Sequence, residues 1–205
     1  LDLSVDLSFF TDGRFTKMLG LTLIFAALFM MIVAISYFSS GADDQSAIAA
    51  ADGASKAKNA GGLAGALVAN AFISQWLGIG SFIIIFLSGA LGTALLRIRR
   101  FNIVGVTIKS LVSAIALSIV AGYISMHFVS DFPLGGMHGL YINSIVKNIG
   151  GEIGALLLSF LLVGVIAVIF IKELGTAARL AIEAYRNLKI RVATENEARR
   201  SKSQS

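Results

Sequence analysis

Residues Leu19–Phe38 read LGLTLIFAALFMMIVAISYF, a stretch of 20 residues without a charged side chain. A helix of about 20 apolar residues is long enough to cross the ~30 Å hydrocarbon core of a bilayer. The stretch is also longer than the apolar part of a signal peptide, which usually has about 7–15 residues. We therefore interpret it as a transmembrane helix that is not cleaved.

Three more stretches have the same character, and we expect spans at about residues 18–40, 79–96, 103–130 and 153–171. Charged residues make up 14% of the chain, whereas soluble domains carry about 25%. An α-helix makes its backbone hydrogen bonds within its own segment, as a single segment surrounded by lipid must. The predicted fold is all-α, a polytopic membrane protein with four transmembrane helices.

The uncharged run from Asn59 to Leu96 is too long for one perpendicular span and tight for two. Its first part, residues 61–78, is rich in Gly and Ala and contains Asn70 and Gln75. We expect this part to form a short helix on the outer side, either in the interface or re-entrant. Irregular backbone at membrane depth requires protein or water around it.

Lys and Arg predict the orientation, because cytoplasmic loops are enriched in them. Fourteen of these residues lie before the first span, between spans two and three, or after span four, and three lie on the opposite side. Both termini are therefore expected in the cytoplasm. The expected parts are a cytoplasmic segment (1–17), the four-helix domain (18–171), and a cytoplasmic helix with the start of a linker (172–205).

The C-terminal part has apolar residues at helical spacing, among them Ile182, Tyr185 and Leu188, with basic residues on other faces. This pattern predicts a cytoplasmic amphipathic helix near the inner leaflet, or alternatively a simple helical linker. From Thr194 onward the composition indicates a disordered linker. The residues expected to contact inner-leaflet lipid are Arg97, Arg99, Arg100, Lys172, Arg179 and Arg186.

A glycine pattern occurs three times, as NAGGLAGAL at 59–67, LGGMHGL at 134–140 and NIGGEIGAL at 148–156. Glycines one helical turn apart allow close helix contact in lipid. The paired glycines could equally supply a turn with positive φ before a helix. The candidates for helix packing or oligomerisation are Gly61, Gly62, Gly65, Gly135, Gly136, Gly139, Gly150, Gly151 and Gly154.

These repeats are among the features by which the chain resembles the N-terminal four-helix membrane domain of the FtsK/SpoIIIE family of bacterial DNA translocases. The other residues that carry the resemblance are YFSS at 37–40 and DDQS at 43–46, and the similar region covers about residues 14–173. An Ala-rich insert at 47–57 departs from the family pattern.

The resemblance implies a full-length protein that is a hexameric, ATP-driven DNA pump of the division septum, acting in cell division and chromosome segregation. It implies that this segment is the membrane anchor and oligomerisation domain. The expected location is the bacterial cytoplasmic (inner) membrane. The implied partners are membrane lipids, further copies of the chain and other membrane proteins of the division machinery. ATP and DNA would bind only to a motor that is absent from these 205 residues.

The residues themselves predict no chemistry. No phosphate-binding loop with its Lys is present, and there is no Cys. The two His, His127 and His138, are too far apart in the sequence for a helical metal pair. We therefore expect no catalytic residue, cofactor or metal, and no enzyme activity in this segment. The alternative is a small transporter or channel subunit with a re-entrant segment at 61–78, since transporters carry broken helices.

Overall fold

The computed structural model describes residues 13–50, 57–128 and 134–202. Every element in this part of the chain is helical, so the predicted all-α class is confirmed. The elements are α2 (Gly13–Ala50), α3 (Gly62–Ala69), the π-helical η1 (Asn70–Leu77), the 3-10 turn η2 (Gly78–Gly80), α4 (Ser81–Leu95), α5 (Ile103–Phe128) and α6 (Gly136–Lys202).

Four helical segments of the described chain are long and apolar enough to cross a membrane: Gly13–Gly41, Gly62–Leu95, Ile103–Phe128 and Gly136–Ile171. The protein is therefore a polytopic membrane protein with four spans, as predicted. The second and fourth segments begin earlier than residues 79 and 153, because helical residues precede each expected span.

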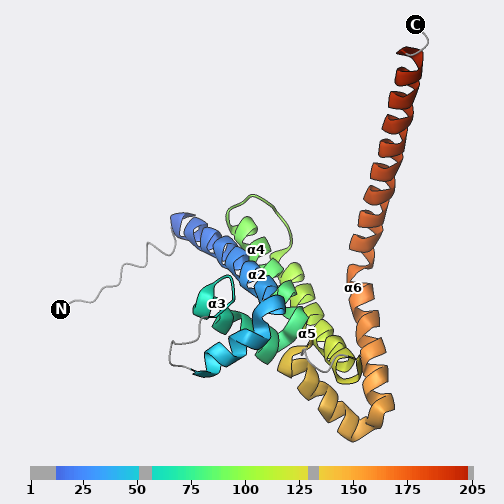
Figure 1. Ribbon diagram of the computed structural model, residues 1–205. Helices are drawn as coiled ribbons and strands as arrows, with labels where there is room; N and C mark the ends of the chain where they lie inside the picture. The colour runs from blue at the N-terminus through green and yellow to red at the C-terminus, as the bar shows by residue number, and fades with distance from the viewer. Residues whose placement is uncertain (1–12, 51–56, 129–133, 203–205) are drawn as a thin grey trace, which may run out of the picture. The chain divides into compact units, whose positions relative to one another are not determined.

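The chain divides into two compact units, Leu1–Ile166 and Ala167–Ser205. Within the first unit α2 packs against α3 and α4, and α4 packs against α5 (Figure 1). The buried core between them contains Val33, Tyr37, Ile73 and Ile85. Since lipid is as apolar as these side chains, close packing rather than escape from water holds such helices together.

Helix α2 is longer than the span that its apolar residues predict. Its 38 residues correspond to about 57 Å at 1.5 Å per residue, well beyond the ~30 Å hydrocarbon core. We expected the first span to end at about residue 40, and the helix continues beyond it to Ala50. A polar network at Asp44, described below, holds this extension against the following segment.

The second span is broken between α3 and α4. Trp76 has non-helical angles (φ −108°, ψ −109°) and Gly78 has φ 60°. The N–H of Ile79 donates to the carbonyl of Leu134 over 2.7 Å, and the Ser81 hydroxyl donates to the Phe72 carbonyl over 2.5 Å. The irregular backbone is thus bonded to protein, as a break in an apolar environment requires.

Helix α6 contains one described non-helical residue, Gly151 (φ 66°, ψ −171°), which separates residues 136–150 from the rest. The first part packs on α5 through Asn143, whose amide Nδ2 donates to the carbonyls of Ile119 and Gly139 over 2.7 and 2.8 Å. In the second unit the helix continues to Lys202, beyond Thr194, where the composition indicates a linker. Ala, Glu, Arg and Lys are good helix formers, which explains the extension.

Candidate helix-packing and lipid-contact sites

The three glycine repeats share one backbone feature. The second glycine of each pair, Gly62, Gly136 and Gly151, has φ +62°, +63° and +66°. A residue with a Cβ pays about 1–2 kcal/mol in left-handed conformations. Each of these glycines stands at the start of a helix, namely α3, α6 and the second part of α6. The repeats therefore form corners that begin helices, which was one of the two sequence-based interpretations.

The first repeat also makes a close helix contact. A Cβ on Gly61 would lie 2.6 Å from Cγ1 of Val33 on α2, and a Cβ on Gly65 would lie 2.9 Å from the same atom. Val33 is itself 1% exposed. Any side chain at Gly61 or Gly65 would therefore push α3 away from α2.

The second repeat lies backbone to backbone against two other elements. A Cβ on Gly136 would overlap the Trp76 carbonyl oxygen and the Gly78 nitrogen, and one on Gly139 would overlap the Ser118 carbonyl oxygen. Gly135 lies equally close to Ser118 and Gly122 on α5. The Ser118 hydroxyl donates to the Gly135 carbonyl over 2.7 Å. This repeat joins the break in the second span to α5 and α6.

The third repeat has no such neighbours within the described chain. A Cβ on Gly150 or Gly151 would meet nothing within 4 Å, and one on Gly154 would meet only Val146, at 3.8 Å. Gly151 supplies the corner in α6, but the chain offers no close helix contact at Gly150 or Gly154. The described residues supply no helix partner at these positions, and the oligomerisation role of this repeat stays a prediction.

A buried polar network at the end of α2 was not predicted. Asp44 is 0% exposed. Its carboxylate accepts hydrogen bonds from the Ser40 hydroxyl, the Lys58 N–H at 2.7 Å and the Asn59 N–H at 3.2 Å. Asn59 in turn donates from Nδ2 to the Val33 carbonyl over 3.0 Å. The network fixes the chain that enters α3, directly before the first glycine corner.

The neighbouring carboxylates of Asp43 and Asp44 have different surroundings. Asp43 is exposed and pairs with the Lys58 ammonium over 2.8 Å. The hydrogen bond and the charge of Asp43 raise the pKa of Lys58. Asp44 stands among small and polar residues, SSGADDQS at 39–46. This local pattern does not reveal its burial, which depends on contacts with Lys58 and Asn59.

The predicted lipid-contacting arginines of the first unit lie in the turn after α4. Arg97, Arg99 and Arg100 are all exposed. The helix ends in a Schellman motif, since the N–H of Ile98 donates to the Thr93 carbonyl over 3.0 Å and that of Arg97 to the Ala94 carbonyl over 2.9 Å. Arg97 occupies the left-handed position (φ 59°) that usually holds Gly.

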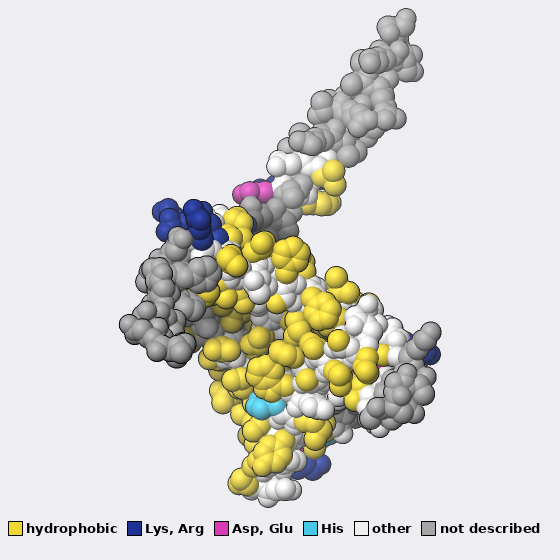
Figure 2. Space-filling view, turned by 90° about the vertical axis from the view of Figure 1, so that its left-hand side faces the viewer, with side chains coloured by type: hydrophobic (Ala, Val, Ile, Leu, Met, Phe, Trp, Pro, Cys, Tyr) yellow, Lys and Arg dark blue, Asp and Glu magenta, His cyan; other side chains and the backbone are white. Residues whose placement is uncertain are grey.

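In the second unit Arg179 and Arg186 are exposed on α6, and the side chain of Lys172 lies outside the described residues. Figure 2 shows that hydrophobic side chains cover much of the face in view of the first unit, and that Lys and Arg gather toward its margins. Exposed apolar side chains such as Phe25, Phe86 and Phe160, at 64–67% exposure, suit a surface that faces lipid.

Titratable groups cluster at one further place. Glu152 contacts both Lys147 and His127, the latter over 3.1 Å, and so links α5 to the corner in α6. Within the described parts of the chain no three His, Cys, Asp or Glu residues lie close enough to hold a metal ion. His138, the other His, contacts the Ser118 hydroxyl over 3.1 Å.

The comparisons with known proteins agree with the four-span architecture. The profile of the family described as the 4TM region of DNA translocase FtsK/SpoIIIE matches residues 13–180. No curated protein and no solved structure matches the chain. The family match covers all four candidate spans, from α2 to the part of α6 that follows Ile171.

Proposed function

Because the chain belongs to the family of 4TM regions of the FtsK/SpoIIIE DNA translocases, we propose that it anchors an ATP-driven DNA translocase in the bacterial cytoplasmic membrane. In this proposal both termini are cytoplasmic, and the segment assembles with further copies of itself and with membrane proteins of the division machinery at the septum. It is not catalytic, and ATP and DNA bind to the motor of the full-length protein.

The observation that best supports an anchor is the number of candidate spans. Four helical segments of the described chain are long and apolar enough to cross a membrane, and the family match covers all four. Insertion of transmembrane helices holds a protein in the bilayer far more firmly than a lipid anchor or an interfacial helix does.

The proposal is tested in the full-length protein in its own host. Residues 13–180 are exchanged for an unrelated four-span membrane domain with both termini in the cytoplasm, and a fluorescent protein marks the C-terminus. We expect the native protein at the septum and the exchanged protein spread over the whole membrane, with defective chromosome segregation. An exchanged protein that still gathers at the septum and supports segregation would show that this segment is a generic anchor.

The alternative function, a transporter or channel subunit, is favoured by one feature, the break at Trp76–Gly80. Transporters place substrates at such breaks, where free backbone groups face a cavity. Here Ile79 and Ser81 direct their donors to protein carbonyls, and no charged residue occurs in 59–96. Solute flux in liposomes that is abolished by Ser81→Ala would favour the transporter.

A further inference from the structure

An apolar groove of about 710 Å³ lies between α2, α4 and the start of α5. Ile24, Leu28 and Met31 form one wall, and Ile85 and Phe86 form the other. Its size falls within the ~300–1,000 Å³ range usual for sites that hold small ligands. Since its walls belong to three spans of a membrane protein, an apolar chain rather than water is the natural occupant.

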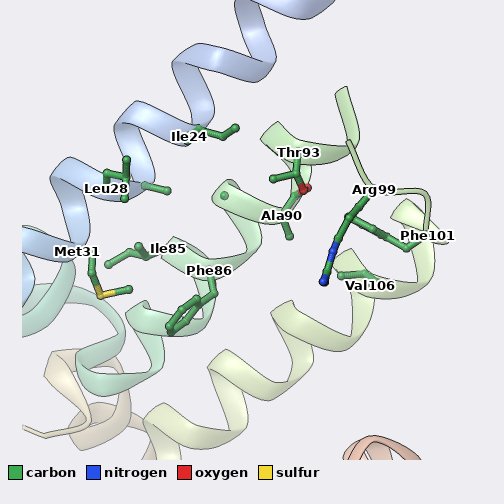
Figure 3. Close-up of a pocket in the computed structure, with 12 residues that line it drawn as sticks. Ile24, Leu28, Met31, Ile85, Phe86, Ala90, Thr93, Arg99, Phe101 and Val106 are labelled. Carbon is green, nitrogen blue, oxygen red and sulfur yellow. The ribbon is translucent and has the colours of Figure 1, made fainter. Parts of the chain in front are cut away.

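One end of the groove is charged. Figure 3 shows the side chain of Arg99 directed into the groove beside Phe101 and Val106, with its guanidinium at the groove's edge. No Asp or Glu occurs between Lys58 and Asp131, so α4, the turn after it and α5 carry no carboxylate. Among the described residues no acidic side chain forms an ion pair with Arg97, Arg99 or Arg100.

The turn that directs Arg99 is strained. Arg97 adopts φ 59°, which costs a residue with a Cβ about 1–2 kcal/mol relative to the right-handed helix. The Schellman motif at Arg97 reverses the chain, and the N–H of Arg99 returns to the Thr93 carbonyl at 3.5 Å. Local strain that persists in a structure often marks a functional position. Here the strained turn brings a guanidinium to the end of an apolar groove.

We propose that this groove binds one anionic phospholipid, with an acyl chain along α2 and α4 and the headgroup phosphate on Arg99. A guanidinium binds phosphate through two parallel hydrogen bonds, and basic pockets between transmembrane helices are suited to anionic headgroups. The proposal rests on the four-span membrane placement and not on a role in DNA translocation, so the two can fail separately.

The test uses Trp fluorescence, with brominated lipids as quenchers. Phe101→Trp places a Trp in the groove wall, and Trp76→Phe removes the native Trp. The double variant is reconstituted in phosphatidylcholine vesicles that contain either brominated phosphatidylglycerol or brominated phosphatidylcholine. We expect the anionic lipid to quench Trp at position 101 with about fivefold higher apparent affinity, the preference expected from one Arg near the headgroups.

Arg99→Gln should abolish this preference, whereas Arg100→Gln, which removes the same charge from a residue outside the groove lining, should keep it. Ala90→Phe, which fills the groove, should reduce quenching by both lipids. Thermal unfolding checks that each variant folds. If Arg99→Gln and Arg100→Gln lost the preference for the anionic lipid equally, surface charge in general would explain the preference. That result would overturn the proposed site. Quenching by neither lipid would mean that protein fills the groove, which also overturns it.

Discussion

At the scale of single residues, Asp43 and Asp44 show how one helical step changes the role of a carboxylate. Asp43 is exposed and pairs with an exposed Lys58, an arrangement that contributes little to stability. Asp44 is buried and accepts three hydrogen bonds. Buried donors left without an acceptor cost about 1–3 kcal/mol each. The second carboxylate therefore stabilises the entry to α3 far more than the first.

We predict that Asp44→Ala lowers the unfolding free energy by about 3 kcal/mol, because it leaves the N–H groups of Lys58 and Asn59 without their acceptor. Asp43→Ala is the matched control and should leave the unfolding nearly unchanged. The measurement is thermal or denaturant unfolding of the purified chain in detergent. Equal effects of the two substitutions would show that Asp44 is solvated in the protein.

At the scale of elements, the sequence predicts the spans well and their interruptions poorly. Absence of charge over about 20 residues is a local property, so the four apolar segments can be recognised without the structure. The break at Gly78 depends on Leu134, more than fifty residues away, whose carbonyl accepts from Ile79. No local pattern encodes that contact. The same holds for Asn143, which is buried because α5 lies against it.

The candidate glycines were found because the pattern repeats, but their roles could not be separated from the sequence. Gly61 and Gly65 contact Val33 tightly, and Gly150 has open space around it. The three repeats read almost alike, yet each faces different neighbours. The repeats do not include three further glycines that make close contacts, so the sequence did not reveal them. A Cβ on any of the three would overlap backbone atoms of another segment: Gly78, Gly80 and Gly122.

A corner glycine can be tested apart from a packing glycine. Gly151→Ala meets no atom within 4 Å but must adopt φ 66° and ψ −171°, at a cost of about 1–3 kcal/mol. Gly136→Ala should cost more or prevent folding, because its Cβ would also overlap the backbone of Trp76. Gly150→Ala is the control, since it has open space and no positive φ.

The three variants are compared by their apparent melting temperatures in the same detergent. We expect the order Gly150→Ala highest, then Gly151→Ala, then Gly136→Ala. If Gly151→Ala melted like Gly150→Ala, the corner in α6 would not require a glycine, and the positive φ could not explain the repeat.

At the scale of the whole molecule, the distribution of Lys and Arg predicts that both termini are cytoplasmic. The chain lacks Cys, so single Cys residues can report on sidedness. Ser46, Asn102 and Asn148 are exposed. In intact cells a membrane-impermeant thiol reagent should label Ser46→Cys and Asn148→Cys but label Asn102→Cys only after lysis. Labelling of Asn102→Cys from outside would overturn the predicted orientation, in which both termini are cytoplasmic.

The second prediction for the whole molecule concerns a contact between copies of the chain. The fourth span is the least buried of the four, with 11% of its most apolar window inside the structure against 22–39% for the others. Gly154, Leu157, Leu161 and Gly164 follow each other at intervals of three and four residues, which places them on one helix face. Leu157 and Leu161 are 62% and 64% exposed, and a Cβ on Gly164 would meet nothing within 4 Å.

We predict that this face is a contact between copies, since small residues let helix backbones approach in lipid. A Leu at Gly164 finds open space within one chain, so Gly164→Leu should leave the melting of the single chain unchanged. In an assembly the added side chain would occupy the space of the neighbouring helix, so copies should dissociate and the measured oligomer mass should fall. Val163→Leu, on the flank of the same helix, is the control. The measurement is the oligomer mass in detergent and in lipid nanodiscs. If this mass were unchanged in both Gly164→Leu and Gly154→Leu, the face would contact lipid and not another copy of the chain.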